Sequence, residues 1–160
     1  KEYGIMEAIF PIGSIVGMVI ISLMNKNKDW YKIVMYSLVI QSVLVMLYGI
    51  PILPNVYERL NNEIIFIIFC IIGLLLTIFN ALVNVPIYTA FQKLVPDEYR
   101  GRFFGVLGTA TQGIVPVGLA VMGIVSDKFS SSIIFIFSGI VCTIMSLIML
   151  RVPEIKEIKY

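Results

Sequence analysis

Charged residues in this chain occur in short clusters separated by long uncharged runs, and this layout constrains the fold more than any other feature. No Asp, Glu, Lys or Arg occurs within residues 64–92, 103–126 or 129–150. Only 14% of the residues are charged and 59% are hydrophobic, whereas soluble domains carry roughly 25% charged residues. A water-soluble fold cannot bury this much apolar surface, so the pattern predicts a polytopic helical membrane protein in contact with the lipid bilayer.

Five apolar segments are long enough to cross the hydrocarbon core, which takes about 20 residues of helix. They cover residues 4–24, 30–53, 64–92, 103–125 and 131–150. Each exceeds the roughly ten residues of a transmembrane β-strand, and none alternates apolar with polar residues. The predicted fold class is all-α, a membrane helix bundle in which short links make consecutive helices antiparallel neighbours.

Basic residues are unequally divided between the two ends of these segments. One side carries Lys26, Lys28, Lys32, Lys93, Arg100, Arg102, Arg151, Lys156 and Lys159, and the other carries Lys1, Arg59 and Lys128. The positive-inside rule makes the first side cytoplasmic, with the C-terminus inside the cell and the N-terminus outside. We expect the plasma membrane as the location. The odd number of segments and the initial Lys favour a part of a longer protein whose N-terminal half is missing here.

Several classes of function are disfavoured by composition. The chain has no histidine, and Cys70 and Cys142 lie inside apolar segments without CxxC spacing, which argues against a metal or redox site. No cofactor is expected. A net charge of +2 is too small to suggest a nucleic-acid partner. A membrane-embedded enzyme would need an intramembrane His, paired acids or a Ser with a base, and none is evident, so the chain is not predicted to be an enzyme.

The first and fourth segments are weakly similar when the chain is shifted by 101 residues. This shift pairs residues 3–6 (YGIM) with 104–107 (FGVL), and Val16-Gly17 with Val117-Gly118. Because these two segments run in opposite directions, the repeat would be inverted, as in many secondary transporters. Segments three to five would form one three-helix unit, and segments one and two would belong to another whose first helix is missing.

Polar side chains inside the apolar segments are the candidate functional residues. Asn80 and Asn84 lie four residues apart on one helical face, where they either form interhelical hydrogen bonds or line a substrate path. In the fourth segment, glycines with Thr109, Gln112 and Pro116 predict either close packing or a hinge near Gly113 and Pro116.

Glu7 is the only acid well inside an apolar segment. It is either a proton-binding group, if it is buried, or an interfacial acid in contact with headgroup water. The predicted loop 95–102 places Asp97, Arg100 and Arg102 at the cytoplasmic ends of two helices. Charge-assisted pairs there could lock the helices together, and the alternative is charge that only sets topology.

The stretch with Asn84-Val85-Pro86, Gln92, Val95-Pro96 and residues 100–105 (RGRFFG) resembles the region joining the tenth and eleventh helices of major facilitator superfamily exporters. The resemblance is to the branch of macrolide-efflux proteins and the enterobactin exporter. It implies that the chain corresponds to helices eight to twelve of twelve. Residues 25–29 after the first segment keep the basic character of the superfamily's signature loop without its Asp, Arg and Gly arrangement.

The resemblance implies a secondary active efflux permease that exports small amphipathic compounds by alternating access and is coupled to protons. Asn80, Asn84, Thr109 and Gln112 would line the substrate path. Asp97, Arg100 and Arg102 would act at the cytoplasmic gate, and Glu7 is the candidate for proton coupling. The alternatives are a non-transporting membrane subunit, a component of a membrane-embedded enzyme, an inactive remnant or a channel.

Overall fold

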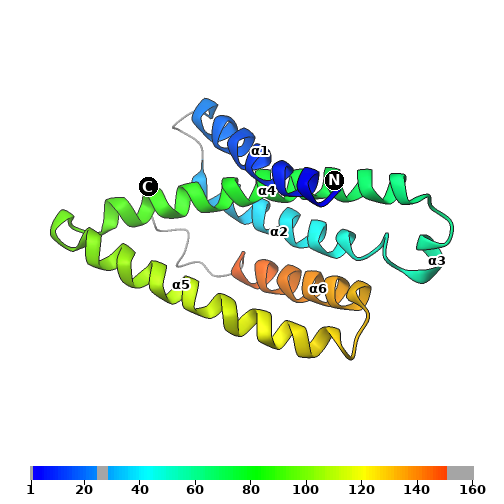
Figure 1. The fold of residues 1–160 in the computed structure, drawn as a ribbon. Coiled ribbons are helices and arrows are strands. Elements are labelled where there is room, and N and C mark those ends of the chain that lie inside the picture. The colour runs from blue at the N-terminus through cyan, green and yellow to red at the C-terminus, as the bar shows by residue number, and fades with distance from the viewer. Residues whose placement is uncertain (1, 25–28, 151–160) are drawn as a thin grey trace.

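The structure, a computed structural model, describes residues 2–24 and 29–150. In that part it consists of helices without strands: α1 (Glu2–Leu23), α2 (Trp30–Tyr48), α3 (Pro54–Tyr57), α4 (Asn62–Leu94), α5 (Asp97–Ser126) and α6 (Ser131–Met149) (Figure 1). All except the four-residue α3 are long and apolar enough to span a membrane. The predicted all-α membrane bundle is confirmed. The basic residues Lys1, Lys26, Lys28, Arg151, Lys156 and Lys159, which entered the prediction of orientation, lie outside the described residues.

Helix α2 ends five residues before the apolar segment does. Gly49 caps it at Tyr48, and Pro51 follows closely. Proline has no backbone N–H to donate and its ring obstructs the preceding turn, so a helix seldom continues through it. The short helix α3 then begins with Pro54 in its first turn, where the fixed φ of proline is favourable.

The predicted loop 95–102 is wrong for most of its length, because α5 begins within it at Asp97. Only Val95 and Pro96 separate α4 and α5. Pro96 has extended backbone at the N-cap of α5, and Asp97 and Glu98 occupy its first turn, where carboxylates interact favourably with the helix dipole. The candidate gate residues therefore lie on a helix.

Glycines mark the closest helix crossings. Helix α1 packs on α4, and α2 packs on both α4 and α6. A Cβ added at Gly17 would lie 2.7 Å from Ala81 Cβ, and one at Gly139 would lie 2.6 Å from Met46 Cβ. Because neither crossing has room for a methyl group, these glycines allow the backbones to approach closely.

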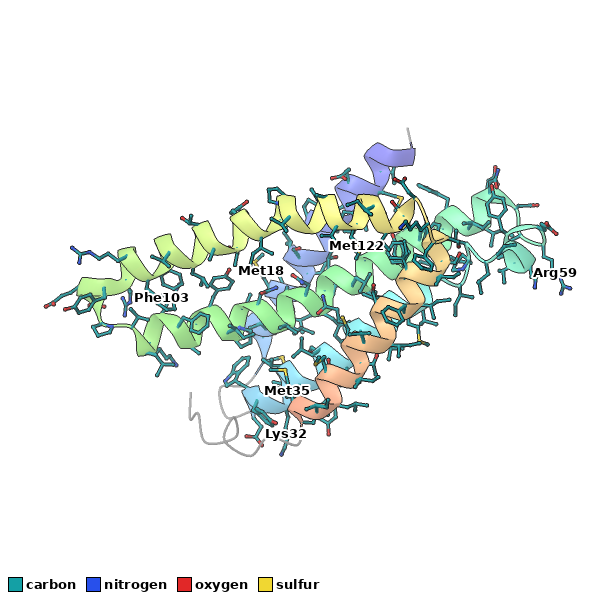
Figure 2. The ribbon with its side chains drawn as sticks, turned by 90° about the horizontal axis from the view of Figure 1, so that it is seen from below. Met18, Lys32, Met35, Arg59, Phe103 and Met122 are labelled. Carbon is teal, nitrogen blue, oxygen red and sulfur yellow. The ribbon has the colours of Figure 1, made fainter. Side chains whose placement is uncertain are left out.

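Helix α5 packs differently from the other long helices. It joins α4 at one end, near Phe103, and α6 at the other, beyond Met122 (Figure 2). None of its residues is buried. A Cβ added at Gly105, Gly108, Gly113, Gly118 or Gly123 would meet nothing within 4 Å among the described residues. Most of the surface of α5 is therefore exposed among the described residues.

The helix bounds repeat with the spacing found in the sequence. Helices α2 and α6 each have 19 residues and begin at Trp30 and Ser131, a difference of 101 residues. Where they cross, Thr143 Oγ1 donates a hydrogen bond of 3.1 Å to Ser42 Oγ, and these residues are also 101 apart. Ser42 and Thr143 would be counterparts in the inverted repeat that the sequence predicts.

Candidate functional site: polar residues of α4 and α5

Asn80 and Asn84 form a hydrogen-bonded pair on α4. Asn84 Nδ2 donates to Asn80 Oδ1 over 2.8 Å and to the Asn80 backbone carbonyl over 3.0 Å. This confirms the shared face expected from their four-residue spacing. Asn80 is exposed and Asn84 is half-buried. The pair leaves the Asn80 amide N–H groups and the Asn84 side-chain oxygen without a hydrogen bond to any described residue, so both can reach a further partner.

Aromatic side chains of α4 and α5 contact each other near the turn that joins the two helices. The rings of Tyr88 and Phe104 stack with centroids 6.3 Å apart, and those of Phe91 and Phe103 meet edge to face at 5.4 Å. Past the Tyr88–Phe104 stack, α5 diverges from α4 (Figure 1), and a Cβ added at Gly108 would meet nothing within 4 Å.

An exposed surface of α5 carries the other two substrate-path candidates, Thr109 and Gln112. A shallow groove of about 650 Å³ is lined by Phe104, Gly105, Gly108, Thr109, Gln112 and Gly113. Gln112 is exposed on this surface. Thr109 Oγ1 donates to the Gly105 carbonyl over 2.8 Å, which satisfies its proton and leaves its lone pairs available. The structure does not bring the polar groups of α5 into contact with the Asn80–Asn84 pair, and no hydrogen bond joins the two sets within the described chain.

A guanidinium group ties the ends of α4 and α5 together beside the aromatic contacts. Arg100 Nε donates to the Gln92 carbonyl over 3.0 Å, and an Arg100 terminal nitrogen lies 2.7 Å from Asp97 Oδ1. The first bond connects the two helices, and the second stays within α5. Both side chains are substantially exposed, where an ion pair contributes little to stability. Arg102 is also exposed and makes no ion pair with a described residue.

The model of the Major Facilitator Superfamily matches residues 1–159. The chain belongs to the major facilitator superfamily. Membership points to a transporter and away from an enzyme.

Among curated proteins, this major facilitator chain is 25% identical to the macrolide efflux protein A of Streptococcus pyogenes, over 97% of its own length. The protein of the same name from serotype M6 gives the same values. The chain spans 35% of the length of these relatives. No solved structure matches it significantly.

The remaining candidate residues of this major facilitator chain are Glu7 and the hinge residues Gly113 and Pro116. Glu7 is exposed on α1. Gly113 and Pro116 lie within α5, which is helical throughout. Proline cannot donate to the carbonyl four residues earlier, so Pro116 leaves the Gln112 carbonyl without its usual main-chain partner. Gln112 is thus a substrate-path candidate and also the residue whose backbone carbonyl loses its partner at the hinge.

Sequence reasoning missed the aromatic residues that contact each other across the α4–α5 turn. Tyr88, Phe91, Phe103 and Phe104 flank the turn at Val95-Pro96 at comparable distances on either side. Aromatic residues at matching distances from a two-residue turn are a signal for contacts across an antiparallel hairpin, and that signal was present in the sequence.

Proposed function

We propose that this chain forms helices eight to twelve of a twelve-helix, proton-coupled efflux permease for small amphipathic compounds of the macrolide type. The complete protein works by alternating access at a site between its two halves. It resides in the plasma membrane with the C-terminus of this chain in the cytoplasm. The names of the curated relatives support an efflux role, and the 35% coverage supports a longer complete protein.

Polar side chains inside uncharged segments are the observation that carries this proposal. They are the Asn80–Asn84 pair on α4 and Thr109 and Gln112 in the groove of α5. Amides inside the hydrocarbon need hydrogen-bond partners. A substrate with hydroxyl and carbonyl groups on an apolar body would provide them, while its apolar surface packs on Phe104 and the glycines of the α5 groove.

Movement of α5 gives the substrate alternate access to the two sides. Arg100 holds the cytoplasmic end of α5 to α4 through its bond to the Gln92 carbonyl, and Asp97 pairs with Arg100 within α5. Arg102 is the third proposed residue of this gate. Pro116 and Gly113 weaken α5 near its middle, because one backbone hydrogen bond is missing and glycine restricts the backbone least. The part of α5 beyond Pro116 can then change its angle while Arg100 keeps the other end of the helix in place against α4.

Glu7 is the proposed proton carrier within this chain. It is an acid in the apolar span of α1. Protonation removes its charge, which changes the energy of exposing it to lipid or to a partner helix. Glu7→Gln mimics the protonated form permanently, so this variant is expected to retain substrate exchange and to lose transport driven by a proton gradient.

Drug-resistance assays on the complete protein test the proposal. Expression in a susceptible host should raise the inhibitory concentration of a macrolide such as erythromycin. Asn84→Ala and Gln112→Ala should each lower apparent substrate affinity about two- to tenfold, since a hydrogen bond contributes roughly 0.5–1.5 kcal/mol. Ile114→Ala is the matched control, because Ile114 lies two residues from Gln112 and so on the other side of α5. Equal losses in all three variants, or no resistance in the wild type, would contradict the proposal.

A further inference from the structure

We infer that the bundle holds a second small-molecule site, between α1, α2, α4 and α6, which takes a planar aromatic alcohol of one or two fused rings. Its pocket has a volume of about 270 Å³. The pocket is lined by Phe10 of α1, Val45 and Tyr48 of α2, Leu76 of α4 and Phe135 of α6. None of the substrate-path candidates lines it, so the inference goes beyond the proposed function and does not rest on it.

The pocket lies at the end of the bundle where α2 ends and α6 begins (Figure 1). Tyr48 is the last residue of α2, and Phe135 lies in the second turn of α6. Val45 and Tyr48 are three residues apart and therefore share one face of α2. Four helices that meet at this end of the bundle thus contribute side chains to one cavity.

Most of the side chains that line the pocket are aromatic. The Tyr48 ring contacts those of Phe69 on α4 and Phe135 on α6, with centroids 4.8 and 5.5 Å apart, and these contacts hold it between the two helices. Phe10 and Phe135 remain 37% and 36% exposed, so ring surface is left for a ligand. Because aromatic rings attract one another beyond the effect of apolar burial, a planar aromatic ligand is favoured over a saturated chain.

Gly73 of α4 keeps the space beside the Tyr48 hydroxyl open. A Cβ added at Gly73 would lie 3.6 Å from Phe10 Cε1 and 3.7 Å from the Tyr48 hydroxyl oxygen. Among the described tyrosines, only Tyr31 forms a hydrogen bond through its hydroxyl, so the Tyr48 hydroxyl has no partner within the described chain. A hydroxyl in apolar surroundings gains stability from a hydrogen bond, and the hydroxyl of a ligand in this space would provide one.

The size of the pocket excludes the proposed transport substrate. Pockets for drug-sized ligands measure roughly 300–1,000 Å³, and this pocket, at about 270 Å³, is smaller. A macrolide, with its large lactone ring and attached sugars, does not fit, whereas two fused rings do. Such a ligand would pack its rings against Phe10 and Phe135 and place its hydroxyl beside that of Tyr48.

Binding of 2-naphthol to the purified complete protein in lipid nanodiscs tests the inference, and empty nanodiscs correct for partitioning into lipid. Val45→Phe adds a ring inside the pocket and should abolish saturable binding. Val43→Phe is the matched control, because Val43 is 38% exposed and lies two residues away on another side of α2. Tyr48→Phe keeps the ring and removes only the hydroxyl. It should weaken binding of 2-naphthol about two- to tenfold and leave binding of naphthalene unchanged.

Saturable binding that Val45→Phe abolishes and Val43→Phe retains supports the site. No saturable binding to the wild type, or equal binding to the two valine variants, would overturn the inference and leave the pocket to lipid acyl chains. Thermal unfolding shows whether each variant is folded. If Val45→Phe does not fold, Tyr48→Phe decides: a loss for 2-naphthol alone supports the site, and equal effects on 2-naphthol and naphthalene contradict it.

Competition with erythromycin separates this site from the substrate path. An excess of erythromycin should leave 2-naphthol bound, and displacement would place 2-naphthol in the substrate path and overturn the inference. Macrolide efflux by the same protein tests the proposed function separately. Binding at the pocket without efflux contradicts only the proposed function, and efflux without binding at the pocket contradicts only this inference.

Discussion

Ser132, at the start of α6, is fully buried, and its hydroxyl has no hydrogen-bond partner among the described residues. An unsatisfied buried hydroxyl costs about 1–3 kcal/mol of stability. Ser132→Ala removes that cost and leaves only a small void, so we expect the unfolding temperature of the protein in detergent to stay the same or rise.

Thr143→Val is the comparison for this prediction, because Thr143 does have an interhelical partner in Ser42. Losing that bond should cost about 0.6 kcal/mol, the average for such bonds in membrane proteins. A clear fall in unfolding temperature for Ser132→Ala would show that its hydroxyl has a partner in the folded protein.

Gly17 and Gly4 differ in surroundings although both lie on α1. A Cβ at Gly17 would lie 2.7 Å from both Ala81 Cβ and the Ile78 carbonyl, and one at Gly4 would meet nothing within 4 Å. Gly17→Ala should therefore destabilise the bundle by about 1–3 kcal/mol through overpacking. Gly4→Ala should be neutral or slightly stabilising, because alanine favours helix over glycine. Thermal unfolding of both variants checks the difference, and equal effects would contradict the close α1–α4 crossing.

At the scale of the helices, the α4–α5 turn depends on one side chain that two substitutions can separate. Arg100→Lys removes the Nε–H group that donates to the Gln92 carbonyl, whereas Asp97→Asn leaves that bond intact and removes an exposed ion pair. We expect Arg100→Lys to slow efflux more than Asp97→Asn, whose cost in stability is only about 0.2–1 kcal/mol. Initial efflux rates at matched expression measure this. A larger effect of Asp97→Asn would assign the gate to the carboxylate.

Helix α5 offers a test of the hinge. Pro116→Ala restores the donor to the Gln112 carbonyl and should stiffen the helix. The expected result is slower turnover with unchanged expression and substrate affinity, read from kcat and KM of transport. Unchanged turnover would show that α5 moves as a rigid rod.

For the whole molecule, hydropathy was sufficient to predict five spanning helices because membrane depth sets their length. Hydropathy misplaced the ends of the helices where turn residues and helix capping determine them. Helix α2 ends early at Gly49 before Pro51, and α5 begins early at Asp97 because acidic residues suit a helix N-terminus. The Asn80–Asn84 pair was predictable because a four-residue spacing is a local property of a helix.

The packing of the helices was not predictable in the same way. Gly17 and Gly118 have similar sequence surroundings, yet one is buried against α4 and the other is open. Only the position of α4 distinguishes them, and that position depends on contacts between residues more than 50 apart in the chain.

Transport by the purified complete protein in vesicles tests the central claim most directly. Labelled macrolide is loaded, a proton gradient is imposed, and efflux is followed in the wild type and in Asn84→Ala. The account predicts gradient-dependent efflux in the wild type and a raised KM in the variant. Efflux that is absent in the wild type, or identical in both proteins, would contradict a transporter that binds its substrate at the polar residues of α4 and α5.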